Sequence, residues 1–114
     1  MKNIHIGNTE IGGDNPCFII AELSANHGKD INIAIETIRA AKKTGADAIK
    51  LQTFTPDTIT LDAKNEAFLI NHGTQWDGKY LHELYNETYL PWEWHERLFK
   101  VAKEEGLVCF SSPF

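Results

Sequence analysis

The sequence has no long hydrophobic run, which argues against the simplest membrane-bound classes of protein. No apolar stretch approaches the roughly 18 residues that suggest a membrane-spanning helix. The first residues, "MKNIHIGNTEIGGDNP", also lack the apolar stretch of a secretion signal. We therefore expect a cytoplasmic protein with no membrane partner.

Clusters of basic residues are absent as well. The chain has 11 Lys and Arg against 16 Asp and Glu, a formal net charge of −5, and the basic residues are scattered along the sequence. A nucleic-acid-binding protein ordinarily gathers positive charge on one face. We expect no nucleic-acid partner.

Cysteine is scarce, and its placement indicates no metal or redox site. Only Cys17 and Cys109 occur, both in strand-like segments, at a spacing that matches no metal-ligand or redox motif. We predict that both thiols are buried. Four of the five histidines, His5, His72, His82 and His95, also lack the mutual spacing of a metal site.

The chain is short for the fold that its pattern indicates. Its 114 residues, 42% of them hydrophobic, suffice for one modest core. A complete (β/α)8 barrel needs roughly 250 residues. We expect one domain or part of one.

Strand-like and helix-like patterns alternate along the sequence. Residues 4–11 predict a β-hairpin, and the apolar run of residues 17–21 predicts a strand buried on both faces. Apolar residues with helical spacing between Asp30 and Gly45 predict a helix. The remaining predictions are a strand over 46–54, an unstructured connection over 55–78, helices over 79–87 and 91–106, and a strand over 107–114.

This order predicts an α/β fold with a parallel sheet, because strands joined through helices form right-handed parallel crossovers. The last predicted strand has no helix after it to cover it. Such an open apolar edge is unusual in a complete domain. We interpret residues 1–114 as the N-terminal part of a (β/α)8 TIM barrel, preceded by a short β-hairpin.

Polar side chains gather at the predicted C-terminal ends of the strands, where parallel barrels carry out their chemistry. Glu22 follows the first strand, Lys50 and Gln52 lie in the second, and Ser112 ends the third. Lys50 and Gln52 share one face because side chains alternate along a strand. The carboxylate is suited to proton transfer, and the ammonium and hydroxyl groups are suited to holding an anion.

Structural explanations compete with these functional ones. Glu22 and Lys50 could form an ion pair between neighbouring strands that serves only the fold. Asn26 and its neighbours could simply shape the turn after the first strand. Trp76, in the long connection, could either stack on a sugar ring or anchor its loop.

Three segments, "FIIAELSANHG", "ADAIKLQTFTPDTITL" and "GLVCFSSPF", resemble in order and spacing the N-terminal third of the sialic acid synthase family. Members of that family condense phosphoenolpyruvate with an N-acetylated amino sugar. The segments "QTFTPDTITL" and "WDGKYLHELY" are similar to the pseudaminic branch of the family. The resemblance covers nearly the whole chain.

The resemblance implies roles for individual residues. It makes Glu22 the active-site carboxylate, and Lys50 and Ser112 contributors to the phosphoenolpyruvate site. Ser112 stands where many relatives have threonine, so the hydroxyl is kept. Gln52 and Thr53 are placed beside the substrates, and Asn26 is a further substrate-binding candidate.

The resemblance also implies features that this sequence does not contain. Family members use a divalent metal, usually Mn²⁺ or Mg²⁺, whose two histidine ligands come from later strands, so we assign no metal ligand here. They act as homodimers in which a small C-terminal antifreeze-like domain reaches the partner's active site. The alternatives to an enzyme of the pseudaminic branch are synthesis of N-acetylneuraminate or legionaminic acid, and a non-catalytic fragment of such a barrel.

Overall fold

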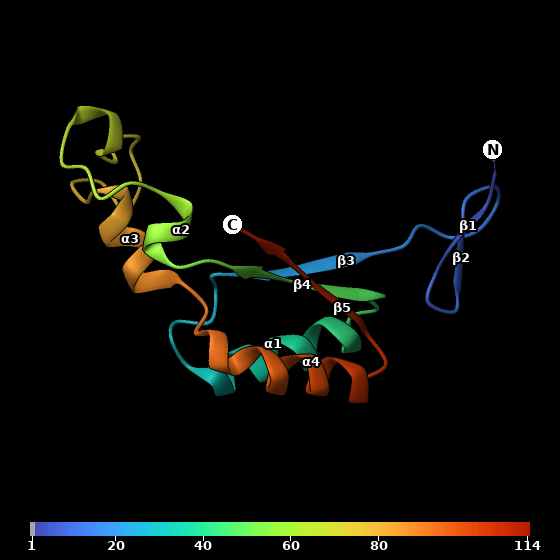
Figure 1. The fold of residues 1–114 in the computed structure, drawn as a ribbon. Helices are drawn as coiled ribbons and strands as arrows, with labels where there is room; N and C mark the ends of the chain where they lie inside the picture. Colours follow the sequence, from blue (N-terminus) through green and yellow to red (C-terminus); the bar gives the residue numbers. More distant parts are fainter. Residues whose placement is uncertain (1) are drawn as a thin grey trace.

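A computed structural model describes residues 2–114 and shows an α/β chain (Figure 1). A short antiparallel hairpin precedes a three-stranded parallel sheet with the order β3-β4-β5. No helix among the described residues is long and apolar enough to cross a membrane. The elements, in chain order, are β1 (Ile4–Ile6), β2 (Thr9–Ile11), β3 (Ile20–Ser24), α1 (Ile31–Lys43), β4 (Ala48–Thr53), α2 (Pro56–Ile59), η1 (Glu66–Phe68), α3 (Leu81–Thr88), η2 (Trp92–Trp94), α4 (His95–Glu104) and β5 (Val108–Pro113).

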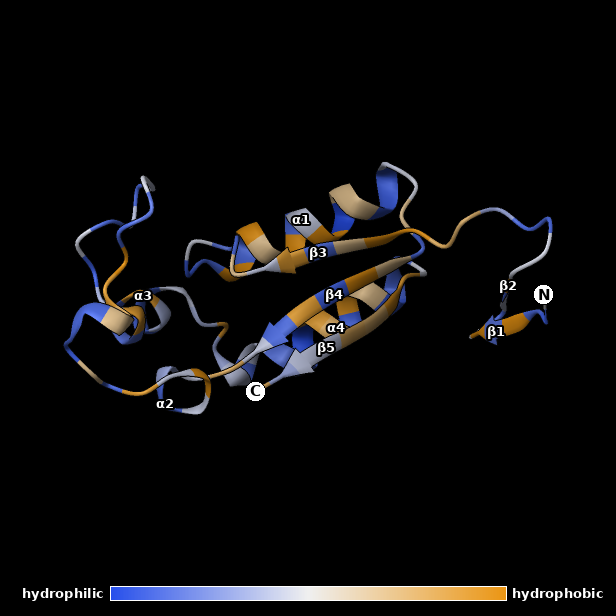
Figure 2. Ribbon diagram, turned by 90° about the horizontal axis from the view of Figure 1, so that it is seen from above, coloured by the Kyte–Doolittle hydropathy of each residue, from blue (hydrophilic) through white to orange (hydrophobic). Residues whose placement is uncertain are grey.

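Helices α1 and α4 cover one face of the sheet, and the other face stays open (Figure 1). This order of strands and helices is the predicted one, and the α/β class is confirmed. The hairpin also forms as predicted, with Ile4 opposite Ile11. It lies at the end of the sheet opposite α2 and α3, joined to β3 by an extended segment (Figure 2).

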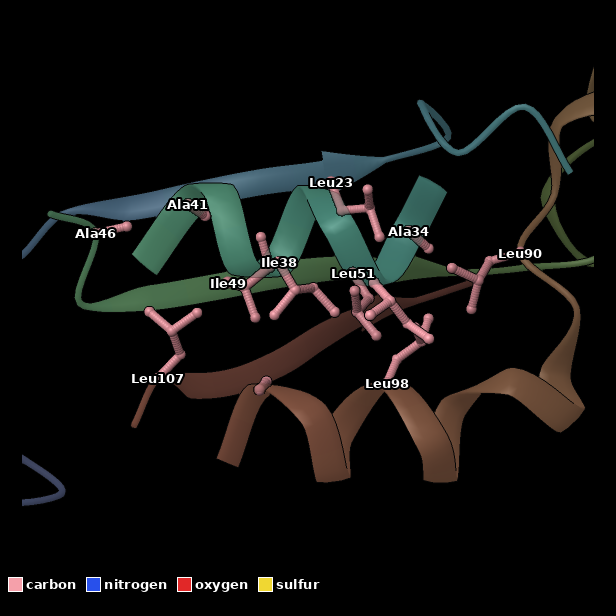
Figure 3. Close-up of a cluster of buried hydrophobic side chains, with 12 residues drawn as sticks. Leu23, Ala34, Ile38, Ala41, Ala46, Ile49, Leu51, Leu90, Leu98 and Leu107 are labelled. Carbon is pink, nitrogen blue, oxygen red and sulfur yellow. The ribbon is translucent and has the colours of Figure 1, made fainter. Parts of the chain in front are cut away.

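The core fills the space between the sheet and its two helices (Figure 3). Leu23 of β3 and Leu51 of β4 point toward α1 and α4, where Ile38 and Leu98 meet them, all four fully buried. Burying one such side chain stabilises a fold by about 1.5–3 kcal/mol relative to leaving it exposed. The helix-facing residues of each strand therefore fix which residues face the other way.

Local signals explain where α1 begins and ends. The Asp30 carboxylate accepts a hydrogen bond from Asn32 N at 2.8 Å, which satisfies a free N–H of the first turn. Gly45 follows the helix with a φ of 99°, a left-handed conformation that glycine adopts without strain. Both boundaries agree with the prediction.

The first parallel strand lies further along the chain than predicted. It spans Ile20–Ser24 rather than residues 17–21, because pairing with β4 begins where Ile20 meets Ala48. Ile19 instead donates its N–H to the Asp47 carboxylate at 2.7 Å, just before β4. The prediction of burial on both faces is also wrong, since Ile20 is 45% exposed on the open face.

The connection after β4 is more ordered than predicted. It contains the short helix α2 and the 3-10 turn η1, and Leu69 forms an isolated bridge with Tyr80. Pro56 stands at the first position of α2, where its missing N–H costs nothing, and Thr55 N donates to Thr58 Oγ1 at 2.9 Å. Together with α3 this segment projects beyond the C-terminal ends of the strands (Figure 1).

The two thiols differ in their surroundings, and the prediction that both are buried is wrong for one of them. Cys17 is exposed in the segment before β3. Cys109 is half-buried in β5, and its burial raises the pKa of the thiol to about 11. Cys17 lies outside the strand because the strand begins only at Ile20.

We expect these thiols to react with iodoacetamide at very different rates. The thiolate is the reactive form. A pKa of about 11 therefore leaves Cys109 at pH 8 with about a hundredfold less thiolate than a thiol with the ordinary pKa of 9.0 has. Mass spectrometry of timed digests of the native protein should find Cys17 modified first. Cys17→Ser should remove the fast-reacting peptide, and equal rates at the two positions would contradict the described burial.

Candidate active site at the strand ends

The register of the sheet brings four polar side chains to its open face. Glu22 of β3 pairs with Lys50 of β4, and Gln52 of β4 pairs with Ser112 of β5. Paired residues of neighbouring strands point to the same side. Because Leu23 and Leu51 face the helices, these four side chains face away from them.

Together these residues line a small pocket of about 110 Å³ at the C-terminal ends of the strands. In Figure 2 the end of β4 is hydrophilic, whereas hydrophobic colour prevails earlier in the strand. The other lining residues are Ser24, Leu51 and Phe114. The sequence prediction that Glu22, Lys50, Gln52 and Ser112 belong together is met by this geometry.

Glu22 and Lys50 form an ion pair. Lys50 Nζ lies 2.9 Å from Glu22 Oε1, and the two side chains are 32% and 56% exposed, respectively. An ion pair this open to solvent ordinarily contributes about 0–1 kcal/mol to stability. The pairing that a purely structural role requires is present, but it contributes little to the fold.

A backbone irregularity directly follows Glu22. The register between β3 and β4 shifts between Glu22 and Ser24, and Ser24 adopts a φ of 50°. A left-handed conformation costs a non-glycine residue roughly 1–2 kcal/mol, and such strain is typical of functional sites. Leu23 enters the core, while Glu22 and Ser24 both line the pocket. Sequence reasoning missed Ser24, although its spacing of two from Glu22 is the signal for a shared face.

Thr53 lies outside the pocket lining, on the face of the sheet opposite Gln52, so its expected place beside the substrates stays a prediction. Its Oγ1 is 2.6 Å from both His95 Nε2 and Ser111 Oγ, on the helix-covered side of the sheet. The alternation of side chains along β4 explains this, since consecutive residues point to opposite faces.

Asn26 also stays outside the pocket. Its side-chain amide donates to Leu23 O at 3.2 Å, and its backbone N–H donates to the same oxygen at 3.0 Å. These bonds form the turn after β3, which is the structural alternative that the sequence left open.

His27 is fully buried behind that turn. Its Nδ1 accepts a hydrogen bond from Lys29 N at 3.1 Å, and its ring lies edge-on to Trp94 at a centroid distance of 5.6 Å. Within the described residues its Nε2 has no hydrogen-bond partner. Burial, and secondly the charge of Lys29, hold the pKa of His27 below its ordinary 6.5.

We expect this histidine to make folding stability depend on pH. Because its pKa is lower in the folded state, the unfolded chain takes up the proton first, so the favourable contribution is complete above pH 6.5 and is lost below it. The loss can reach about 1.4 kcal/mol per pH unit for one proton.

Thermal unfolding of the complete protein between pH 7.5 and 5 measures this effect. The matched variant is His27→Asn, whose amide oxygen can still accept from Lys29 N but does not titrate. Its stability should fall less than that of the wild type over the same range. Parallel curves for the two proteins would show that His27 does not titrate on unfolding.

Metal-binding groups are lacking in this part of the chain. Among residues 2–114, no three His, Cys, Asp or Glu side chains come close enough together to hold a metal ion. His82 pairs through Nε2 with Asp57 at 2.9 Å, and it links α2 to α3. The described residues therefore do not by themselves provide a metal centre.

The fold and the pocket define a class, namely parallel α/β proteins with a polar site at the C-terminal ends of the strands. The NeuB family model matches residues 37–114. The chain belongs to the NeuB family.

Individual relatives agree with this assignment. The chain is 51% identical over 111 residues to a pseudaminic acid synthase of Campylobacter jejuni, covering 97% of this chain and 32% of the relative. It is 50% identical over 99 residues to the pseudaminic acid synthase of Helicobacter pylori, covering 87% and 29%. The chain thus spans about a third of the length of these curated relatives.

A solved structure has a similar fold. The N-acetylneuraminic acid (sialic acid) synthetase of Leptospira borgpetersenii, crystallised in complex with citrate, matches with a TM-score of 0.75 and 28% identity. The match covers 99% of this chain and 34% of that protein.

Proposed function

We propose that this chain is the N-terminal part of a pseudaminic acid synthase. The observation that carries the proposal is the identity of 50–51% with two proteins of that name over most of the chain. An N,N'-diacetyllegionaminic acid synthase of Legionella pneumophila is only 36% identical over 104 residues. Synthesis of legionaminic acid and synthesis of N-acetylneuraminate are the alternative reactions within the family.

The proposed architecture is a (β/α)8 barrel of which residues 1–114 form the first strands. Three features support it: parallel strands in sequential order, helices on one face only, and an open face whose side chains become more polar toward the strand ends. A barrel interior is the natural environment for such a face. Further strands and a small antifreeze-like domain would complete the enzyme.

The proposed reaction joins phosphoenolpyruvate to 2,4-diacetamido-2,4,6-trideoxy-L-altrose. Carbon 3 of phosphoenolpyruvate forms a bond to the aldehyde carbon of the open-chain sugar, whose oxygen takes up a proton. Water adds to carbon 2 and loses a proton, and the bond from carbon 2 to the phosphate oxygen breaks. Pseudaminic acid and inorganic phosphate result.

The pocket residues suit these steps. Lys50 supplies a positive charge and Ser112 a hydroxyl for the phosphate or carboxylate of phosphoenolpyruvate. Glu22 can accept the proton of the attacking water or handle the proton of the sugar oxygen. Gln52 offers both a donor and an acceptor to the bound substrates.

The divalent metal that the family resemblance implies does not fit the residues described here. A single carboxylate, Glu22, faces the pocket, and the described chain offers no group of three ligands. Any Mn²⁺ or Mg²⁺ ligands would come from outside this chain, so none of the steps above is assigned to a metal.

Phosphate release tests the proposal. The complete protein that contains this chain would be supplied with phosphoenolpyruvate, Mn²⁺ and each candidate acetamido sugar in turn. We expect release with the diacetamido-trideoxy-altrose sugar only, and unlabelled phosphate when the reaction runs in water enriched in oxygen-18. Release with another sugar would select an alternative synthase.

A non-catalytic role is the second candidate. Absence of release with every sugar, from a folded complete protein, would favour a barrel fragment that only binds or dimerises.

Two further parts of the proposal are a homodimeric enzyme and a cytoplasmic location. Light scattering of the complete protein tests the first of these.

A further inference from the structure

Three polar side chains behind the pocket, His95, Thr53 and Ser111, form a hydrogen-bonded relay that takes no part in the chemistry above. His95 Nε2, Thr53 Oγ1 and Ser111 Oγ are joined by two contacts of 2.6 Å each. His95 Nδ1 lies 3.0 Å from Trp92 O. All three polar side chains are half-buried, between the sheet and the start of α4.

Hydrogen-bond chemistry decides which members of this relay donate and which accept. A backbone carbonyl only accepts, so His95 Nδ1 must carry a proton and donate to Trp92 O. In the neutral ring Nε2 is then bare and accepts from the Thr53 hydroxyl. The Thr53 oxygen in turn accepts the hydroxyl proton of Ser111, so every member is satisfied.

The relay joins β4, β5 and α4 at the level of the pocket. Thr53 ends β4 directly after Gln52, and Ser111 precedes Ser112 in β5. His95 begins α4, which starts beneath the C-terminal ends of the strands (Figure 1). Strands β4 and β5 thus each present one residue to the pocket and its sequence neighbour to the relay on the opposite face.

The ladder between β4 and β5 ends at this point. Its last register pair is Thr53 opposite Pro113, and Phe114 N donates to Thr53 O at 3.0 Å. The contact between the Thr53 and Ser111 hydroxyls links the side chains of the two strands beside this bond. A shift of about 1 Å in a positioned group can reduce catalysis by roughly a hundredfold.

We propose that His95, acting through Thr53 and Ser111, is a positioning residue that holds Gln52 and Ser112 in place for the phosphoenolpyruvate anion. The inference rests on the proposed function. It concerns a residue 42 positions from Thr53 in the sequence and on the far side of the sheet from the pocket.

The test compares Thr53→Val, which removes the hydroxyl at nearly constant volume, with Thr53→Ser, which keeps it. In the complete protein, Thr53→Val should raise the KM for phosphoenolpyruvate about tenfold with kcat changed less than threefold. It should also speed amide hydrogen exchange over residues 50–54 and 108–114. Thr53→Ser should restore both values. His95→Gln, which keeps an acceptor near the Nε2 position, should be affected less than His95→Phe.

The outcomes are distinguishable. A lowered melting temperature with unchanged KM and unchanged local exchange would overturn the positioning role and leave the proposed function intact. If the wild type releases no phosphate, the proposed function fails, and the exchange comparison alone still decides whether this relay orders the strand ends. Should Thr53→Val fail to fold, Ser111→Ala, which removes only the far hydroxyl, carries the same expectations.

Discussion

Glu22→Gln should abolish turnover in the complete enzyme while leaving it folded. The substitution keeps the size of the side chain and one acceptor oxygen but removes its capacity to take up a proton. General acid–base catalysis contributes about 10²- to 10⁴-fold in rate, so kcat should fall by at least about a hundredfold. Phosphate release under saturating phosphoenolpyruvate and sugar measures this loss.

The half-exposed pair with Lys50 explains why folding should survive. Its loss should change the free energy of unfolding by no more than about 1 kcal/mol. Glu36→Gln, on the exposed surface of α1, is the matched control and should keep full activity. Near-normal turnover in Glu22→Gln would remove Glu22 from the chemistry.

Lys50→Ala should mainly weaken the use of phosphoenolpyruvate. A hydrogen bond to a charged group is worth about 1.5–3 kcal/mol, which corresponds to a rise of about tenfold to a hundredfold in the apparent KM. Initial rates over a range of phosphoenolpyruvate concentrations, at fixed sugar, give this value.

The same experiment separates the two interpretations of the ion pair. Lys43→Ala, at the exposed C-terminal end of α1, should leave the KM unchanged. If Lys50→Ala lowers stability without changing the KM for phosphoenolpyruvate, Lys50 serves the fold and not the substrate.

Periodicity predicted much of this fold because burial enforces it. The helical spacing of apolar residues after Asp30 matches the face of α1 that packs on the sheet. The two-residue period of β4 predicted that Lys50 and Gln52 share a face, and the register brings Glu22 and Ser112 beside them. That these four residues share one pocket was therefore predictable from the strand ends, whereas Ser24 was missed.

What could not be predicted depends on pairing and on distant contacts. An apolar run does not say which of its residues pair, so the start of β3 at Ile20 depends on the contact with Ala48. The shift at Ser24 is a backbone irregularity with no sequence pattern of its own. The contact of Thr53 with His95 joins residues 42 positions apart.

A crystal structure of the complete protein with phosphoenolpyruvate would most directly test the claim that the strand-end pocket is the active site. We expect an oxygen of the phosphate or carboxylate within hydrogen-bond distance of Lys50 Nζ and of Ser112 Oγ, with Glu22 facing the reacting carbons. Phosphoenolpyruvate bound elsewhere, with the pair of Lys50 and Glu22 unchanged and no ligand atom near Ser112, would contradict it.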